Sequence, residues 1–234
     1  MGILDFLRRP RISRKPKIPF KDIEVSEAKR GDYDKFRKKL IDSSLIMLIT
    51  GKRGSGKTSL GMKLLEIFKN KSPRECYIVN YKKARLPGWM HKIDSVEEAP
   101  NNSVVLIDEG AIGYFSRESM KEANRVLSKI MTLARHKNLT LIIITQNSAM
   151  IDLNVVRLAD TLVFKEPSLL QARFERRALK DMFDKVTPFF KRCEEPNKNF
   201  YVWDDDFEGM LFYDLPGFWT ESISTSFRDF GNKR

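Results

Sequence analysis

The sequence is poor in the residues from which metal centres, disulfide frameworks and catalytic triads are built. It has two cysteines and two histidines among 234 residues. Cys76 and Cys193 lie far apart and have no partner pair of histidine or cysteine at metal-ligand spacing, which argues against a zinc site and against a disulfide framework. Neither His91 nor His136 has a serine or cysteine nucleophile context, so no catalytic triad is predicted. A reducing, intracellular setting is expected.

Long apolar runs are also missing. No stretch approaches the roughly 18 to 20 residues that a membrane-spanning helix needs, and the N-terminus has no signal-peptide apolar core. No internal repeat is present. The length and the 41% apolar content suit one large domain with appendages. We therefore expect a protein that is soluble, or at most peripheral to a membrane.

The charge is strongly positive and unevenly distributed. A formal charge of +12 points to nucleic acid or an anionic membrane surface as a partner. Residues 1–43 are predicted to form a basic, proline-punctuated arm followed by a helix over Ser26–Lys39. Residues 201–234 are aromatic and acidic, and we expect them to pack on the core or on a second subunit, with Asp204, Asp205 and Asp206 at the surface. The intervening residues 44–200 form the predicted catalytic domain.

Within residues 44–200, apolar runs alternate with amphipathic ones. This alternation predicts an α/β fold with a mostly parallel sheet flanked by helices. The predicted strands are Leu45–Thr50, Tyr77–Asn80, Val104–Ile107, Leu141–Thr145 and Thr161–Phe164. The predicted helices are Lys57–Lys69, Ser119–Arg135 and Leu169–Val186.

The first predicted strand leads directly into GKRGSGKT, which matches the phosphate-binding loop pattern at every fixed position. Its glycines let backbone N–H groups surround a phosphate, and the N-terminus of the following helix adds its positive dipole. Lys57 is expected to reach the terminal phosphates and Thr58 to bind Mg²⁺. The predicted cofactors are ATP and Mg²⁺. The predicted nucleotide-binding residues are Gly51, Lys52, Arg53, Gly54, Ser55, Gly56, Lys57, Thr58 and Ser59.

A second buried strand, in SVVLIDEG, ends in two acids. Asp108 is expected to hold the metal through its water shell, together with Thr58. Glu109 is expected to direct the attacking water as general base. A carboxylate in that position favours hydrolysis over transfer of phosphate to a bound substrate. The predicted activity is therefore that of an ATPase.

Two polar residues bracket the most apolar strand, within ARHKNLTLIIITQN. In a parallel sheet, the exit of this strand brings Gln146 to the phosphate loop, where an amide can sense the γ-phosphate. Arg135 precedes the strand, and the two ends of the strand are on the order of 20 Å apart. We therefore predict that Arg135 acts on the site of a neighbouring subunit as an arginine finger. Closure of a helix C-terminus is the alternative.

The phosphate loop, the Asp-Glu strand end and the Arg-strand-Gln combination together resemble the HerA/FtsK superfamily of DNA-pumping ATPases over residues 44–165. The resemblance implies an additional-strand, catalytic-glutamate core in which the Gln strand lies between the other two. It also implies a homo-hexameric ring, with ATP sites between subunits and double-stranded DNA in the central pore.

The short single-domain chain is most similar, within this superfamily, to the genome-packaging ATPases of membrane-containing archaeal icosahedral viruses of the turreted type. It has no room for the extra domains of the cellular members. The resemblance implies an ATP-driven double-stranded DNA translocase that packages a viral genome into a preformed capsid. The implied location is the host cytoplasm, with possible association with membrane or virion.

Basic loops are candidates for gripping DNA phosphates. They supply Lys82, Lys83, Arg85, Lys92 and Arg117, for which solvated connections are the alternative. Two other functions stay open. One is a membrane-associated ATPase of conjugation or filamentous-phage assembly, in which the N-terminal arm contacts the membrane rather than the capsid. The other is a nucleotide-gated scaffold with little hydrolysis.

Overall fold

A computed structural model of the chain describes residues 19–81, 85–108, 120–145, 153–168, 177–220 and 222–223. The elements in chain order are β1 (Glu24–Gly31), α1 (Tyr33–Asp42), β2 (Ile46–Thr50), α2 (Lys57–Lys71), β3 (Cys76–Val79), β4 (Met90–Ile93), the 3-10 helix η2 (Val96–Glu98), β5 (Val104–Ile107), α4 (Met120–His136), β6 (Thr140–Thr145), α5 (Leu153–Leu158), β7 (Thr161–Phe164), α7 (Arg177–Lys191), β8 (Asn199–Trp203) and β9 (Phe207–Phe212).

The strands form one nine-stranded sheet in the order β1-β9-β8-β7-β2-β6-β5-β3-β4. All strands from β7 to β4 are parallel to their neighbours, whereas β8, β9 and β1 add antiparallel pairs at the other end. Strand β6 lies between β2 and β5, which is the order predicted for an additional-strand core. The predicted fold class is therefore confirmed.

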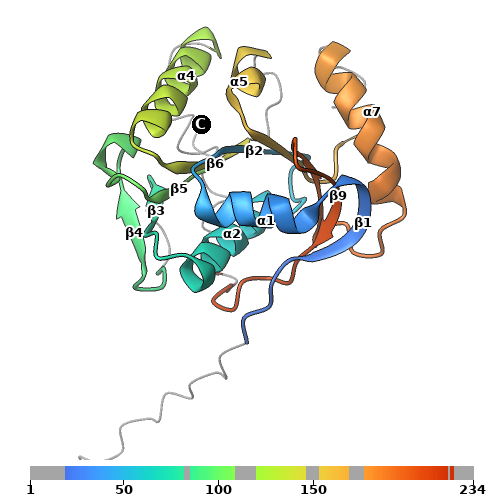
Figure 1. Ribbon diagram of the computed structural model, residues 1–234, viewed down its shortest axis with the longest axis horizontal. Helices are drawn as coiled ribbons and strands as arrows, with labels where there is room; N and C mark the ends of the chain where they lie inside the picture. The colour runs from blue at the N-terminus through green and yellow to red at the C-terminus, as the bar shows by residue number, and fades with distance from the viewer. Residues whose placement is uncertain are drawn as a thin grey trace, which may run out of the picture.

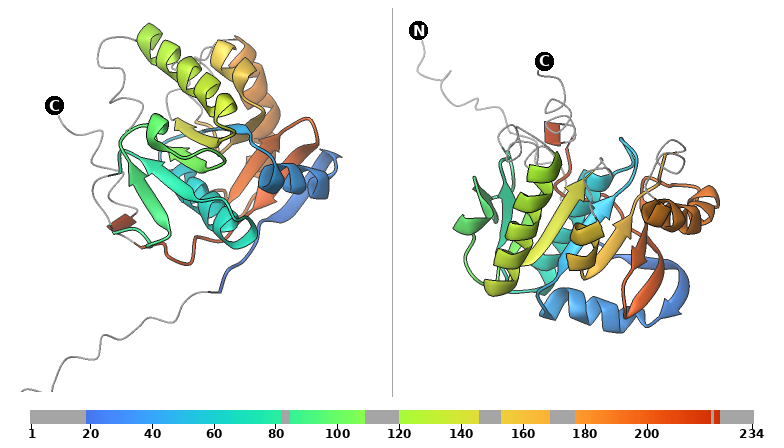
Figure 2. Two further views of the ribbon diagram at one scale, coloured as in Figure 1. Left: turned by 60° about the vertical axis from the view of Figure 1, so that its left-hand side comes forward. Right: turned by 90° about the horizontal axis from the view of Figure 1, so that it is seen from above.

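Helices cover both faces of the sheet. Figure 1 shows α1 and α2 on one side, and Figure 2 shows α4, α5 and α7 side by side on the other. Each side has its own apolar cluster of buried residues. Coverage on both faces explains why β2, β5 and β6 read as unbroken apolar runs, since neither face of these strands meets water. No helix among the described residues is long and apolar enough to cross a membrane.

The leading segment differs from its prediction. The helix expected over Ser26–Lys39 is strand β1 followed by α1. Every side chain of β1 is exposed, and its sequence has no alternation of apolar and polar residues. The strand forms because its backbone pairs with β9. Asp32 ends the strand and begins the helix, because its carboxylate accepts hydrogen bonds from the N–H groups of Asp34 and Lys35 at 2.8 and 3.2 Å.

The C-terminal segment also contributes to the sheet. The boundary predicted between residues 200 and 201 falls inside β8, and β9 joins β8 to β1. Asp204 is buried, which corrects its prediction as a surface acid. Its carboxylate accepts two hydrogen bonds of 2.9 Å from Lys39 and one of the same length from the N–H of Asp206. Asp205 is exposed, as expected. Helix α7 begins at Arg177, and residues 169–176 of the predicted helix lie outside the described residues.

Candidate nucleotide-binding site

The phosphate-binding loop lies at the end of β2, and α2 follows it immediately. Gly56 is the residue that precedes the helix, with a left-handed φ of 88° and no side chain to cap the helix. The first N–H groups of a helix have no partner within the helix, and the helix dipole makes that end favourable for a negative charge. The loop and the first turn of α2 therefore form an anion-binding end of the kind predicted.

Two glycines of the loop are required by close neighbours. A Cβ on Gly51 would lie 2.8 Å from the Cβ and the carbonyl oxygen of Lys165. A Cβ on Gly56 would lie 2.7 Å from the carbonyl oxygen of Asn197 and 3.1 Å from the hydroxyl of Tyr213. Both positions also have a positive φ. Because a side chain would meet backbone at each site, only glycine lets the loop adopt this path.

The other loop residues differ in how they are held. Lys57 is buried, and its ammonium donates to the carbonyls of Gly51 at 2.9 Å and Lys52 at 2.8 Å, so it lies across the curve of the loop. Lys52 makes an ion pair of 2.6 Å with Glu166. Arg53 and Gly54 are exposed at the tip.

The predicted metal ligands are in contact. The hydroxyl of Thr58, in the first turn of α2, donates to the carboxylate of Asp108 at 2.8 Å. Asp108 directly follows β5, and the pairing of β5 with β6 and of β6 with β2 aligns the ends of all three strands at one edge. Parallel pairing thus joins two residues that are fifty positions apart in the chain.

The residues present fit a triphosphate and Mg²⁺. Ser55 is fully buried within the loop, and its hydroxyl has no hydrogen-bond partner among the residues described. A buried hydroxyl of this kind is suited to a phosphate oxygen. Thr58 and Asp108 supply hard oxygen ligands, and Mg²⁺ is bound by one or two carboxylates together with substrate phosphates. The described residues contain no cluster of three or more acidic, cysteine or histidine ligands that would form a separate metal centre.

Several predicted site residues lie outside the described residues. They are Glu109, Gln146, Lys82, Lys83 and Arg117. The strands that precede the first two, β5 and β6, end at the edge occupied by the phosphate loop. The roles of these five residues stay predictions.

Arg135 lies near the C-terminal end of α4, before β6 begins. Its guanidinium donates to the carbonyl of Leu158 at 2.9 Å and to the carboxylate of Asp160 at 3.1 Å. Asp160 in turn accepts from the N–H of Ile46 at 2.7 Å, at the start of β2. Arg135 is therefore at the sheet edge opposite the phosphate loop, and its side chain is 52% exposed. Its action on a neighbouring subunit stays a prediction.

The candidate DNA residues that are described lie around β4. Arg85 is exposed in the connection before this strand. Lys92 is within β4, and its ammonium lies 5.2 Å from the centre of the Tyr81 ring. The segment predicted as a loop from Tyr81 to Lys92 therefore includes an edge strand that pairs in parallel with β3.

Three residues around the loop were not predicted from the sequence. Lys165 and Glu166 follow β7, and Tyr213 follows β9. Glu166 pairs with Lys52, and the hydroxyl of Tyr213 contacts the carbonyl of Gly56 at 3.0 Å. The hydroxyl of Ser59 lies 2.9 Å from that of Tyr213 and 2.9 Å from the carbonyl oxygen of Gly56. No local motif marks these residues, because strand pairing brings them to the loop.

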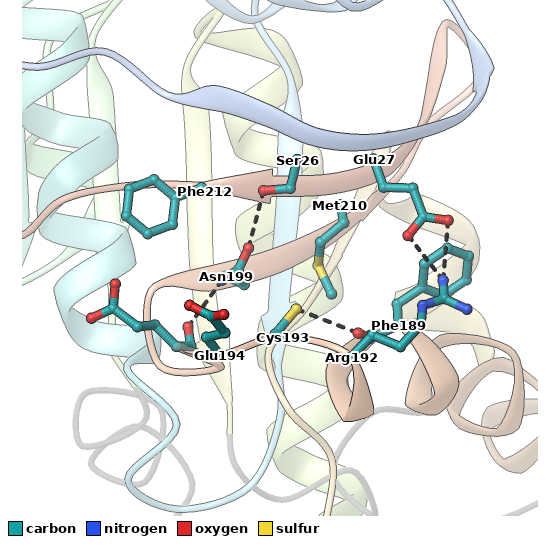
Figure 3. Close-up of a pocket in the computed structure, with 10 residues that line it drawn as sticks. Ser26, Glu27, Phe189, Arg192, Cys193, Glu194, Asn199, Met210 and Phe212 are labelled. Carbon is teal, nitrogen blue, oxygen red and sulfur yellow. Dashed lines mark hydrogen bonds and ion pairs between the residues drawn. The ribbon is translucent and has the colours of Figure 1, made fainter.

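A hollow of about 340 Å³ lies at the antiparallel end of the sheet (Figure 3). Arg192 and Glu27 form an ion pair across it at 2.9 Å, and Ser26 donates to the side chain of Asn199 at 3.1 Å. It is lined by residues of β1, α7, β8 and β9 and of the connection after α7. None of the predicted nucleotide-binding residues lines this hollow.

The phosphate loop on β2, the aspartate after β5 and the strand inserted between them define a P-loop NTPase. The family model Novel STAND NTPase 3 matches residues 29–160, which is more than half of the chain. The chain belongs to this family. The predicted ATPase class of enzyme is thereby confirmed, as is nucleotide binding. No curated protein sequence matches the chain.

Two viral proteins have a similar fold. The genome packaging NTPase of Sulfolobus turreted icosahedral virus 2, in complex with AMPPCP, aligns with a TM-score of 0.50 and 17% identity over 74% of this chain and 98% of that chain. The DNA-packaging ATPase from Sulfolobus Turreted Icosahedral Virus aligns with a TM-score of 0.52 and 14% identity over 73% and 98%. The predicted resemblance to turreted-virus packaging ATPases is confirmed at the level of the fold.

Proposed function

We propose that this NTPase is an ATP-driven motor that moves double-stranded DNA, and that its task is to package a viral genome into a preformed capsid. The observation that carries the proposal is the extent of the fold similarity. Both viral proteins are genome-packaging enzymes, and the match extends over 98% of each viral chain. The complete phosphate loop and the Thr58–Asp108 contact support nucleotide hydrolysis as the energy source.

The proposed reaction uses the residues at the edge of the sheet. Thr58 and, through water, Asp108 would hold Mg²⁺, and Lys57 and the loop N–H groups would bind the phosphates. Glu109 accepts a proton from the attacking water, and Gln146 reports whether a γ-phosphate is present. Each role follows from the position of the residue in the chain and from the chemistry of its side chain.

The proposed polymer is double-stranded DNA, bound through its phosphates. A net charge of +12 favours a polyanion, and a motor that moves along any sequence needs contacts that do not read bases. The basic residues of the described surface include Arg85 and Lys92, close to the edge strand β4. We propose that they grip DNA together with Lys82, Lys83 and Arg117.

A homo-hexameric ring is proposed as the working form. Arg135 lies at the sheet edge opposite its own phosphate loop, and its guanidinium is half exposed. A neighbouring subunit could present its nucleotide to this guanidinium, which would stabilise charge that develops during hydrolysis. Completion of each site by a second subunit would couple hydrolysis to movement around the ring.

The decisive experiment measures ATP turnover with and without linear double-stranded DNA, together with displacement of a triplex-forming strand from that DNA. The proposal expects DNA to stimulate turnover and ATP to be needed for displacement. Glu109→Gln should retain ATP and lose both signals. Turnover that DNA does not raise, in a protein that stays monomeric with ATP and DNA, would contradict the proposal.

Measurements of liposome binding and of assembly, added to this experiment, separate the two alternative functions. A membrane-associated assembly ATPase would bind anionic liposomes through residues 1–19 and would show no stimulation by DNA. A nucleotide-gated scaffold would assemble with ATP, and Glu109→Gln would leave its assembly unchanged. Either result would replace the translocase proposal.

A further inference from the structure

The antiparallel end of the sheet brings three distant segments to the phosphate loop. Strand β7 runs parallel to β2, so Lys165 leaves the sheet at the same edge as Gly51. Strand β8 is antiparallel to β7 and therefore begins at this edge, just after Asn197. Strand β9 is antiparallel to β8 and ends there, directly before Tyr213. These segments pack against the loop at Gly51 and Gly56.

Lys165 is fully buried behind the start of the loop. Its ammonium donates to the carbonyl of Asn197 at 2.8 Å and to that of Asn199 at 2.6 Å, and it lies 3.5 Å from the hydroxyl of Tyr213. No carboxylate ion pair with Lys165 occurs among the described residues. A buried lysine that is held by neutral oxygens is costly unless every donor is satisfied. Lysine is therefore an unfavourable residue at this buried position unless its hydrogen bonds serve the loop beside it.

Tyr213 contacts the end of the loop, as Lys165 contacts its start. Its hydroxyl is within 3.0 Å of the carbonyl of Gly56 and 2.9 Å of the hydroxyl of Ser59, and it lies 3.2 Å from the carbonyl of Asn197. The ring of Tyr213 is fully buried. A single phenol thus connects the last glycine of the loop, the first turn of α2 and the residues that hold Lys165.

The backbone completes the support. The N–H of Lys165 donates to the carbonyl of Thr50 at 2.7 Å, and the carbonyl of Glu166 accepts from the N–H of Lys52 at 2.9 Å. The start of the loop is therefore fixed by Lys165 and Glu166, and its end is fixed by Tyr213. Between these two attachments the loop has only the few residues that curve around a phosphate.

We propose that Lys165 and Tyr213 are positioning residues for the phosphate-binding loop, which make the C-terminal strands β8 and β9 part of the nucleotide site. A loop that is already held in its binding geometry loses less conformational freedom when a nucleotide binds. The support therefore acts mainly on nucleotide affinity and less on the rate of the chemical step. This inference rests on the nucleotide site and is independent of DNA translocation.

The test compares Tyr213→Phe with Tyr201→Phe. Tyr201 is a matched control, because it is equally buried, it lies in β8, and its hydroxyl donates to Glu208 at 2.7 Å, away from the loop. The dissociation constant of a fluorescent, non-hydrolysable ATP analogue is measured without DNA. Tyr213→Phe is expected to weaken binding about tenfold, which corresponds to about 1.4 kcal/mol, and to change kcat at saturating ATP by less than about twofold. Tyr201→Phe should lower the melting temperature and leave the dissociation constant unchanged.

A purely structural role would give a different pattern. In that case both variants would lose thermal stability and neither would change the affinity of the folded protein for the analogue, which would overturn the proposal. If Tyr213→Phe does not fold, Ser59→Ala replaces it, since this variant removes the hydroxyl that contacts Tyr213 and keeps the phenol in place. It should weaken binding by a smaller factor, and an unchanged affinity would again overturn the proposal. Because DNA is absent, failure of the translocase proposal would not alter either result.

Discussion

At the scale of single residues, the site depends on a few polar groups whose surroundings decide their chemistry. Thr58 and Asp108 meet at 2.8 Å although they belong to different strand-helix units. Burial, and then the nearby Lys57, hold the pKa of the Lys165 amine well below its ordinary value of 10.5. Sequence motifs predict the Thr58–Asp108 pair, whereas the surroundings of Lys165 follow only from the packing of the folded chain.

Replacement of Asp108 by asparagine should abolish most of the hydrolysis. The amide keeps the shape of the side chain and its contact with Thr58, but it lacks the negative charge that is proposed to hold the metal. The loss is expected to be several kcal/mol of transition-state stabilisation, on the order of 100-fold or more in kcat. Steady-state ATPase assays across a Mg²⁺ titration measure it. Asp205→Asn, at an exposed position, is the control, and an active Asp108→Asn enzyme would refute the assignment.

Lys165 predicts a particular dependence of stability on pH. The pKa of Lys165 in the folded state lies below 10.5, the ordinary value that it has in the unfolded chain. At a pH between these two pKa values, the amine is protonated in the unfolded chain and neutral in the folded chain. Between these two pKa values, the contribution of Lys165 to the free energy of unfolding therefore increases as the pH rises toward about 10.5 and decreases as the pH falls.

Urea unfolding of the wild type and of Lys165→Met between about pH 7 and pH 10 tests this dependence. The difference in unfolding free energy should shift in favour of the wild type as the pH rises. Lys180→Met, at an exposed lysine, should follow the wild-type pH dependence. A difference between wild type and Lys165→Met that stays constant with pH would show that the amine keeps its ordinary titration.

At the scale of elements, the sequence predicts the central parallel strands of the sheet but not its antiparallel strands. The central parallel strands β2, β5 and β6 are apolar runs followed by loops or helices, which is a contiguous signal. The edge strand β1 has only exposed side chains, and the sequence predicts a packing segment from residue 201 onward, where most of β8 and all of β9 lie. Strand β8 pairs locally with β9, but the pairing of β1 with β9 joins remote positions, as in the pairing of Glu24 with Phe212.

The contact between α1 and the β8–β9 turn should contribute strongly to stability. Asp204 has a fully buried carboxylate that accepts from Lys39, whose side chain is 27% exposed. Asp204→Ala would leave the ammonium of Lys39 with Asp206 alone, at 3.6 Å, and the N–H of Asp206 without its partner. We expect a loss of about 2 to 4 kcal/mol in the free energy of unfolding.

Chemical denaturation of Asp204→Ala and Asp205→Ala measures that contribution with a neighbouring control. Asp205→Ala should change the unfolding free energy by less than about 0.5 kcal/mol, because surface substitutions rarely do more. Equal effects of the two substitutions would mean that the Lys39–Asp204 pair does not hold α1 on the sheet.

At the scale of the whole molecule, the sheet separates the nucleotide-binding edge from the edge that carries Arg135. The phosphate loop, Asp108 and the Lys165–Tyr213 support share one edge, while Arg135 and Asp160 lie at the other. One strand length separates the edges, on the order of 17 Å for β6. An arginine at the far edge can complete a catalytic site only in a second subunit, through a head-to-tail contact of the kind that closes rings.

Mixtures of two inactive variants test this arrangement. Arg135→Ala lacks the finger and Lys57→Ala lacks the phosphate ligand, so each alone should have little ATPase activity. Random mixing at equal amounts should restore about a quarter of the sites, because one interface in four then combines an intact Lys57 with an intact Arg135. A mixture of Lys57→Ala with Glu109→Gln should recover nothing beyond its components, since both residues are expected to belong to the same subunit's site. Mixed rings without recovery in the first pair would exclude the finger.

The sequence by itself determined the parallel core and the nucleotide chemistry. A phosphate loop, an acid after a buried strand and an apolar run each occupy a few consecutive positions, so local spacing suffices to recognise them. The tertiary structure decided that β1, β8 and β9 extend the sheet, that Asp204 is buried, and that Lys165 and Tyr213 lie behind the loop. Apart from the local β8–β9 hairpin, those placements arise from pairing between remote segments, which leaves no spacing pattern along the chain. The support of the loop depends on the tertiary structure, because β8 begins and β9 ends at the edge where β2 ends.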